Sequence, residues 1–372
     1  MSKPLEGYKV LDFSTLLPGP MAGLILAEAG ATVIKIERPG GEDMRFYDPL
    51  WGKEAVNFAL LNRGKKSLAL DLKDPEALAK LRPLLEEADV LLEQFRPGVM
   101  ERLGLGYEAV KAINPRLVYC AITGYGASGS KKMVAGHDLN YIGDTGLLSL
   151  SHGTPQQPVL PPALIADIAG GTYPAVMNIL LALLQRARSG AGCFLDIAMT
   201  DSLFTFQYWA MGAGIASGDW PENGAGLVTG GTPRYQLYPT QDGRLLAAAP
   251  LEDKFWRAFC DLLDLREAWR ADANDPEGTK RAVAEIVASQ PASHWEPLLK
   301  AADCCCSIVK SLEEALADPH FQERGLFAGR LINEAGAEMP ALPVPLAPVF
   351  REDDDRPQAA PPLGADNEDL LG

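Results

Sequence analysis

This 372-residue sequence lacks the cysteine patterns of disulfide-rich and zinc-binding proteins. Its six cysteines include the run Cys304, Cys305 and Cys306, and no CxxC pair is present. Three adjacent cysteines have the wrong spacing for a tetrahedral zinc site, so we expect no bound metal. In a chain of this length, scattered cysteines are typical of reduced thiols, which predicts a cytoplasmic protein.

Positive charge is also scarce, because the formal net charge is -15. Nucleic acids and anionic membranes attract basic surfaces, so we expect neither as a partner. The apolar stretch near residues 176–184 is too short to span a bilayer, and the start MSKPLEGYKV lacks the apolar segment of a signal peptide. A few well-placed Lys and Arg side chains can still bind a phosphorylated ligand in an acidic protein.

Short apolar runs alternate with helical patterns along the first 200 residues. Residues 8–13 and 31–36 have buried-strand patterns and flank a helical run over 21–28. A strand, a helix and a second strand in this order are typical of a parallel sheet. Further strands are predicted at 67–72, 89–93, 117–123 and 194–199, and further helices at 74–87, 107–113 and 167–188. The predicted fold class is therefore α/β with a parallel sheet.

The composition changes near residues 217–233, where Gly, Pro, Asn and Thr predominate and predict a linker. Beyond it, residues 234–238 and 245–249 predict a hairpin around the turn at 241–243. Helical patterns then continue to residue 316. The segment 340–362 is rich in Pro and Asp and predicts a terminal extension.

The sequence lacks several short motifs that identify nucleotide-binding or catalytic sites. The first strand-to-helix turn, STLLPGPMAG, lacks the GxGxxG fingerprint, which disfavours an NAD-dependent enzyme. No P-loop, HExxH or GxSxG occurs either. Basic residues nevertheless recur beside predicted strands, namely Arg38, Lys65, Lys66, Lys73 and Arg96. Solvated surface charge explains each residue by itself, whereas their recurrence favours a phosphate site.

Three polar residues are candidates for acid–base chemistry. His137 follows a glycine in AGHDLNY, Asp167 begins a long predicted helix in LIADIAGG, and Glu252 begins another in APLEDKF. A surface histidine and two carboxylates favoured at helix starts are the simpler interpretations. Gly170 and Gly171 weaken that interpretation for Asp167, because poor helix formers at a helix start indicate a close approach to the backbone.

Together, several segments resemble the class III CoA-transferase and α-methylacyl-CoA racemase superfamily, the CaiB/BaiF proteins. The segments that carry the resemblance are LEGYKVLDFSTLLPGPMAG, ATVIKIERPGG, LNRGKKSLALDLK, EQFRPGVMERLGLGYE, TGYGASG, AGHDLNYIG, the ADIAGG helix and LEEALADPHFQERGLF. They occur in the expected order and cover nearly the whole chain.

The resemblance implies a Rossmann-like large domain, a smaller α+β domain and an interlocked homodimer. It divides the chain into a large CoA-binding domain over 1–200, a linker over 201–233, a small domain over 234–325 and a C-terminal return to the large domain over 326–372. CoA enters as part of an acyl-CoA thioester substrate, and no permanently bound cofactor is implied. The residues implied to contact CoA are Arg38, Leu72, Lys73, Arg96, Arg102, Asp138 and Tyr141, with Lys65 or Lys66 near phosphate.

Two reactions share this scaffold. The transferases use an aspartate, which matches Asp167, as the nucleophile for an acyl intermediate. The racemases use the same aspartate as a base and place a histidine, which matches His137, on the opposite face. Glu252 matches the racemase glutamate that hydrogen-bonds this histidine, so the three residues together favour a 2-methylacyl-CoA racemase or epimerase. The alternatives are a CoA-transferase and a catalytically silent CoA-binding protein.

The enolate formed by a racemase needs N–H donors, and the start of the Asp167 helix supplies candidates. Two segments differ from the family pattern, Ser130-Lys131-Lys132 and the run of three cysteines at 304–306. Both leave the acyl group open to branched fatty acyl, bile-acid-like and small dicarboxylic substrates.

Overall fold

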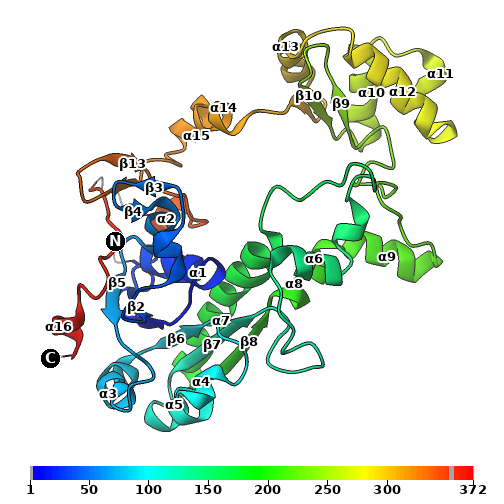
Figure 1. Cartoon of the computed structure of the whole chain (residues 1–372). Coiled ribbons are helices and arrows are strands. Elements are labelled where there is room, and N and C mark those ends of the chain that lie inside the picture. Colours follow the sequence, from blue (N-terminus) through cyan, green and yellow to red (C-terminus); the bar gives the residue numbers. More distant parts are fainter. Residues whose placement is uncertain (1–2, 352–355, 372) are drawn as a thin grey trace. The chain divides into compact units, whose positions relative to one another are not determined.

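The computed structural model describes residues 3–351 and 356–371, and the chain forms two compact units. The first unit contains Met1–Thr145, Pro162–Thr205 and His320–Gly372, and the second contains Gly146–Pro161 and Phe206–Pro319. Three separate stretches of sequence therefore build the first unit. Figure 1 labels the helices and strands along the chain.

A six-stranded sheet forms the centre of the first unit (Figure 1). Its strands lie in the order β5-β2-β1-β6-β7-β8, and every neighbouring pair is parallel. The bounds are β1 Lys9–Asp12, β2 Thr32–Glu37, β5 Lys66–Ala69, β6 Val90–Glu93, β7 Val118–Thr123 and β8 Phe194–Ala198. This parallel sheet confirms the predicted α/β class.

Helices cover both faces of the sheet (Figure 1). Helices α1 and α7 pack on one face, whereas α3 and α5 pack on the other. The helices of the unit are α1 Pro18–Glu28, α2 Val56–Asn62, α3 Ala77–Glu87, α4 Val99–Arg102, α5 Tyr107–Ile113, α6 Asp138–Asp144, α7 Tyr173–Ser189 and α8 Met199–Phe206. Because both faces are covered, β6 and β7 are buried along their whole length, which explains why their sequences are nearly continuous apolar runs.

The second unit contains a three-stranded antiparallel sheet in the order β11-β10-β9. Its strands are β9 Gln236–Pro239, β10 Leu245–Ala248 and β11 Cys306–Ile308, and its helices are α9 Tyr208–Ser217, α10 Asp253–Leu262, α11 Glu267–Arg270, α12 Pro276–Val287, α13 Ala292–Ala302 and α14 Leu312–Leu316. Trp256, Phe259 and Trp295 are buried in its core. The unit therefore has an apolar core of its own, as an independent domain does.

The C-terminal part of the chain lies against the edge of the large sheet. After α15 Pro319–Glu323, the hairpin β12 Arg330–Ile332 and β13 Glu338–Pro340 leads to α16 Asn367–Leu371. Two residues near α16 bind the edge strand β5, since Asp366 accepts a hydrogen bond from the Ser67 N–H at 2.8 Å and Asn367 accepts one from the Ala69 N–H at 2.8 Å. These contacts cover an edge that would otherwise expose unpaired backbone groups.

The observed boundaries correct several sequence expectations. The predicted linker 201–233 is helical over most of its first half, where α8 Met199–Phe206 and α9 Tyr208–Ser217 lie. Residues 146–161, predicted in the large domain, belong to the second unit, where His152 N–H donates to Asn223 at 2.9 Å. The helix predicted over 74–87 begins at Ala77, and Asp74 instead closes a turn by accepting a hydrogen bond from the Glu76 N–H.

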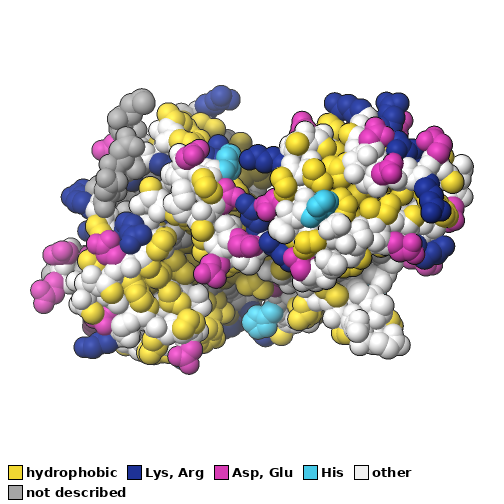
Figure 2. Space-filling model, turned by 90° about the horizontal axis from the view of Figure 1, so that it is seen from above, with side chains coloured by type: hydrophobic (Ala, Val, Ile, Leu, Met, Phe, Trp, Pro, Cys, Tyr) yellow, Lys and Arg dark blue, Asp and Glu magenta, His cyan; other side chains and the backbone are white. Residues whose placement is uncertain are grey.

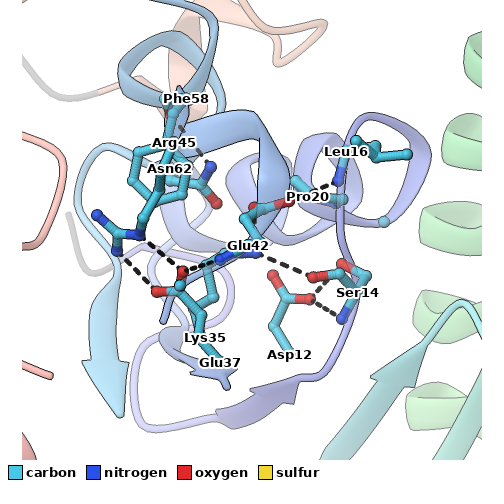
Figure 3. Close-up of polar contacts among 12 residues, drawn as sticks. Asp12, Ser14, Leu16, Pro20, Lys35, Glu37, Glu42, Arg45, Phe58 and Asn62 are labelled. Atoms are coloured by element: carbon cyan, nitrogen blue, oxygen red, sulfur yellow. Dashed lines mark hydrogen bonds and ion pairs between the residues drawn. The ribbon is translucent and has the colours of Figure 1, made fainter. Parts of the chain in front are cut away.

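Buried ion pairs fix the carboxyl ends of β1 and β2 (Figure 3). Lys65 Nζ, fully buried, lies 2.9 Å from Asp12 Oδ2 and also donates to Pro20 O and Asn62 Oδ1 at 2.8 and 2.9 Å. Burial alone would raise the pKa of Asp12, but Lys65 and Lys35 outweigh it and hold that pKa below its ordinary value. The Asp12 carboxylate therefore stays charged inside the fold.

A second buried pair continues the network (Figure 3). Lys35 Nζ lies 2.8 Å from Glu42 Oε1 and donates to Ser14 O at 2.9 Å, while Glu42 accepts from the Leu16 N–H at 2.7 Å. Leu16 has a φ of 61°, a left-handed conformation that a leucine rarely adopts. The ion pairs therefore hold the turn after β1 in a shape that its residues would not take by themselves.

We expect Lys65→Ala to lower the free energy of unfolding by about 3–5 kcal/mol, because it leaves the Asp12 carboxylate buried without its cation. The matched control is Lys66→Ala, which removes an exposed lysine at the next position and should change stability by less than about 0.5 kcal/mol. Chemical denaturation followed by circular dichroism measures both. Equal losses in the two variants would contradict the role of the buried pair.

Candidate active site

A cavity of about 320 Å³ opens at the carboxyl end of the parallel sheet. Its walls come from the turns after β1, β6 and β7, from α6 and from the helical segment that precedes α7. The lining residues include Thr15, Leu16, Gln94, Arg96, Thr123, Lys132, His137, Tyr141 and Asp167. Ligands of open parallel sheets bind outside this end of the strands, so the cavity lies where the fold class places a site.

Asp167 lies in the wall of this cavity, half-buried, at the second position of the segment Ala166–Thr172. Its backbone N–H donates a hydrogen bond to Asp138 Oδ1 at 3.0 Å. Burial and the neighbouring Asp138 carboxylate raise the pKa of Asp167 to about 6, against an opposing effect of His137. Such a carboxyl gains and loses a proton close to neutral pH, as a general acid or base must.

The segment Ala166–Thr172 is a π-helix rather than the first turn of an ordinary α-helix. A Cβ atom on Gly170 would lie 2.4 Å from the Met199 carbonyl oxygen, so the close approach predicted at Gly170 is made by the chain's own backbone. Thr172 Oγ1 donates to Pro18 O at 2.8 Å and ties the segment to α1. Helix irregularities of this kind are common at functional sites.

Two of the predicted N–H donors for an enolate already have partners inside the protein. The Asp167 N–H is bonded to Asp138, and the Ile168 N–H donates to Leu164 O at 3.1 Å. The role of this segment toward an enolate therefore stays a prediction. The cavity also contains the cationic side chains of Arg96 and Lys132.

His137 is the exposed residue that precedes α6, and it lines the same cavity. Its backbone N–H donates to Asn140 Oδ1 at 3.0 Å, which fixes the start of the helix. The Tyr141 hydroxyl donates to Gly136 O at 2.5 Å, and its ring packs edge-on against Tyr125 with centroids 5.2 Å apart. The loop that carries His137 is therefore held from the helix side.

Glu252 belongs to the second unit, where it is exposed and precedes α10. Its side chain makes no cap hydrogen bond with that helix. His137 belongs to the first unit and Glu252 to the second, so the hydrogen bond between the His137 imidazole and the Glu252 carboxylate stays a prediction. The first unit brings five predicted site residues together at this cavity, namely Arg96, His137, Asp138, Tyr141 and Asp167.

The predicted CoA contacts differ in their surroundings. Arg96 and Tyr141 line the cavity, and Asp138 lies beneath it as the acceptor of the Asp167 N–H. Arg38, Lys66, Lys73 and Arg102 are exposed, and Leu72 is partly exposed. Arg38 pairs with Asp43 and donates through Nε to Gly41 O at 2.6 Å. These positions leave Arg38, Lys66, Lys73 and Arg102 accessible to a phosphate.

Lys65 is removed from the predicted CoA contacts. Its side chain has no exposed surface, and three acceptors, on Asp12, Pro20 and Asn62, surround its ammonium group. An ammonium group has three N–H donors, so none is left for a phosphate. Of the two adjacent lysines, Lys66 alone is exposed.

A second cavity of about 310 Å³ adjoins the first and shares residues 95–97, Thr123 and Lys132 with it. Glu93, at the carboxyl end of β6, lines this cavity and is buried. Burial raises the pKa of Glu93 to about 7, against the hydrogen bond it accepts from the Phe95 N–H at 2.7 Å. The sequence analysis does not single out three residues of these cavities, namely Glu93, Gln94 and Lys132. For Glu93 a signal exists, because a carboxylate at the end of a buried strand is visible in the sequence.

A carboxyl with a pKa near neutrality and an imidazole on one cavity define an α/β protein equipped for acid–base or nucleophilic catalysis. The family model of CoA-transferase family III matches residues 5–367. This chain therefore belongs to CoA-transferase family III, whose members act on CoA thioesters.

Relatives of both reaction types are similar to this chain. The α-methylacyl-CoA racemase of Homo sapiens is 33% identical over 376 residues, which cover 99% of this chain and 92% of the relative. The acetyl-CoA:oxalate CoA-transferase of Acetobacter aceti is 31% identical over 371 residues, with 96% and 92% coverage. The crystal structure of Rv3272 from Mycobacterium tuberculosis superposes with a TM-score of 0.83 at 29% identity and covers 99% of both chains.

These likenesses confirm the family and the fold that the motifs indicated. The relatives are enzymes, and the racemase and the transferase are similar to this chain to nearly the same degree. The choice between the two reactions therefore depends on the residues of the site. No group of His, Cys, Asp or Glu suited to a metal ion occurs among residues 3–351 and 356–371.

We expect Asp138→Asn to lower the pKa of Asp167 below about 6, because an amide keeps an acceptor oxygen but removes the neighbouring charge. Carboxyl carbon NMR of Asp167, assigned by its loss in Asp167→Asn, measures the midpoint. Asp144→Asn is the control, since that exposed carboxylate binds Tyr125 and Lys131 instead. An unchanged or raised midpoint in Asp138→Asn would contradict the account.

The same shift gives stability a defined pH dependence. The pKa of Asp167 in the folded protein lies above its ordinary value of 3.8, so its protonated form stabilises the fold at low pH. This contribution is present below that value and is lost as the pH rises through about 6. We expect this pH-dependent loss of unfolding free energy to be smaller in Asp138→Asn. Urea unfolding at a series of pH values measures it.

Proposed function

We propose that this protein is a racemase or epimerase of 2-methyl-branched acyl-CoA thioesters. The observation that carries the proposal is that His137 and Asp167 line one cavity, with the pKa of Asp167 raised to about 6. Inversion of a carbon centre needs one group that removes a proton on one face and a second group that supplies a proton on the other. The racemase relatives support this choice of reaction.

The proposed reaction has two proton transfers. The Asp167 carboxylate takes the hydrogen of the α-carbon as a proton, and the electron pair of the C–H bond moves into the thioester as an enolate. The His137 imidazolium then donates its Nε2 or Nδ1 proton to the opposite face of that carbon, and the carbonyl bond re-forms. In the reverse direction the two residues exchange roles. Glu252 would hydrogen-bond His137, and Arg96 and Lys132 would lie near the enolate charge.

CoA itself would be held by the exposed cations near the strand ends. Arg38, Lys66, Lys73 and Arg102 are accessible for phosphates, and Arg96 lies at the cavity. Guanidinium groups suit phosphates because they donate two parallel hydrogen bonds. On the face shown in Figure 2, Lys and Arg side chains are interspersed with Asp and Glu, unlike the basic band that binds nucleic acids. We propose an acyl-CoA thioester as the ligand and, from the scattered free cysteines, a cytoplasmic location.

A CoA-transferase is the second candidate, and the transferase relatives favour it. In that reaction Asp167 would attack the thioester carbonyl, and the thiolate of CoA would leave. Hydroxylamine would then trap an acyl group on Asp167, and exchange of CoA between carboxylic acids would survive His137→Ala. The racemase proposal requires the reverse, namely that His137 is essential and that no second carboxylic acid is needed.

We expect the protein to invert a 2-methylacyl-CoA in deuterated water with uptake of one deuterium at the α-carbon. His137→Ala and Asp167→Asn should each slow inversion by about 10²–10⁴-fold, because each removes one of the two proton-transfer groups. His152→Ala, a histidine in the second unit, is the control and should keep the rate. Chiral chromatography with mass spectrometry measures both inversion and label. Unchanged inversion in His137→Ala would sink the proposal.

We also propose that the protein is a homodimer. One face of α7 is apolar and exposed along its length, through Tyr173, Met177, Leu180, Leu181 and Leu184. Monomeric soluble proteins rarely expose apolar patches of this extent, and protein interfaces are a common reason for them. The patch therefore supports the dimer that the family resemblance implies.

A membrane is the alternative cover for this face. The continuous helical stretch Ala166–Ser189 is long and apolar enough to cross a bilayer by length and composition alone, a test that core helices of soluble proteins also pass. Its other face packs on the sheet, and Arg186 near its end is buried and lies 2.7 Å from Asp89. A helix with one face built into an α/β core cannot present lipid with apolar groups on all sides.

We expect Leu181→Glu combined with Leu184→Glu to convert a dimer into monomers, because it places two charges on the apolar face. The matched control is Val309→Glu combined with Leu312→Glu, which alters exposed apolar residues of the second unit. Size-exclusion chromatography with light scattering measures the mass. A monomeric wild-type protein, or one that sediments with lipid vesicles, would contradict the proposal.

A further inference from the structure

A third cavity in the first unit gathers basic side chains away from the Asp167 site. It has a volume of about 260 Å³ and lies where the C-terminal segment packs beside the ends of α1 and α2. Five arginines line it, namely Arg63, Arg324, Arg330, Arg351 and Arg356, whereas Glu28 is the one acidic residue in the lining that the structure describes. This concentration contrasts with the formal net charge of -15 for the whole chain.

Arg63 forms the fixed floor of the cavity. Its guanidinium is buried and donates to Glu28 at 2.9 Å, to Leu60 O at 2.8 Å and to Leu342 O at 2.7 Å. Glu28 thus neutralises Arg63, and the bond to Leu342 ties the floor to the C-terminal segment. The charge that remains available in the cavity comes from Arg324, Arg330 and Arg351.

Arg351 and Arg330 are only partly satisfied by the protein. Arg351 donates through Nε to Leu346 O at 2.9 Å, a neutral acceptor, and no carboxylate among residues 3–351 and 356–371 pairs with it. Arg330 lies 3.5 Å from Glu338, and both side chains are more than one third exposed. An ion pair at this distance and exposure contributes little, so it does not compete strongly with a bound anion.

Arg324 is an exposed arginine whose guanidinium is free to bind a ligand. Its guanidinium forms no hydrogen bond or ion pair with any residue in 3–351 or 356–371, although it lines the cavity beside Gly325 and Leu326. Guanidinium groups repel one another, so several of them around one recess cost free energy unless an anion is present. Arginines that converge in this way are typical of phosphate sites, because each planar fork can donate two parallel hydrogen bonds.

We propose that this cavity binds a phosphoryl dianion through Arg324, Arg330 and Arg351, over the floor made by Arg63 and Glu28. A dianion fits better than a single carboxylate, since three cations face the recess and one arginine is enough to satisfy a carboxylate. The cavity volume suits a phosphoryl group with a small substituent rather than a whole nucleotide. The proposal does not depend on the reaction at Asp167, because none of these residues lines the cavity of Asp167.

Calorimetric titration with inorganic phosphate at constant ionic strength tests the site in the full-length protein. We expect saturable binding by the wild type and at least about tenfold weaker binding by Arg324→Gln combined with Arg351→Gln. The matched control is Arg82→Gln combined with Arg116→Gln, which removes the same charge from exposed positions elsewhere in the unit and should stay within about twofold. Equal affinities in the two double variants, or no saturation of the wild type up to about 10 mM phosphate, would overturn the proposal.

A second measurement uses the wild-type protein alone, so it does not depend on whether the variants fold. Anomalous diffraction from crystals of the wild type soaked in tungstate, a phosphate analogue, should show a peak between Arg324 and Arg351, and an empty cavity beside peaks elsewhere would overturn the assignment. Competition identifies the source of the phosphoryl group. Displacement of phosphate by CoA but not by dephospho-CoA would assign the site to the 3′-phosphate of the substrate, whereas displacement by neither would assign it to a separate small phosphate ester.

Discussion

Two buried lysines hold together the end of the sheet on which the site depends. Lys65 neutralises Asp12, and Lys35 neutralises Glu42, with all four side chains withdrawn from solvent. Their contacts fix the turn after β1, in which Leu16 takes a left-handed conformation while its N–H bonds Glu42. Thr15, Leu16 and Pro18 from this turn line the cavity, and Pro18 O accepts from Thr172 in the π-helical segment. A buried charge network thus determines where Asp167 is placed.

Burial of carboxylates also determines the chemistry of the site, because it shifts their pKa values. Asp12 keeps its charge because cations surround it and lower its pKa. Asp167 has the carboxylate of Asp138 as its neighbour, and its pKa is raised to about 6. Two aspartates of one unit therefore have opposite pKa shifts, one suited to structure and the other to proton transfer. Glu252, the third residue of the proposed catalytic set, belongs to the second unit.

The sequence predicted the parts of the fold that local patterns determine. Strands buried on both faces require continuous apolar residues, so β1, β2, β6 and β7 were found to within about two residues. Lys65 was misassigned because its partner Asp12 lies 53 residues away and no local pattern reveals that pairing. Gly170 was correctly singled out, but the group that approaches it is the backbone of Met199. The arginine cavity joins residues from both ends of the chain, which no single segment could indicate.

We infer that Asp167 and His137 serve opposite faces of one carbon, and hydrogen exchange measured separately for each epimer tests this inference. Each pure epimer of a 2-methylacyl-CoA is incubated in deuterated water with Asp167→Asn and with His137→Ala, and exchange into the unreacted substrate is followed by mass spectrometry. We expect each variant to exchange the α-hydrogen of only one epimer and to leave that epimer uninverted. The epimer that exchanges should differ between the two variants. Loss of exchange for the same epimer in both variants would contradict the two-face arrangement.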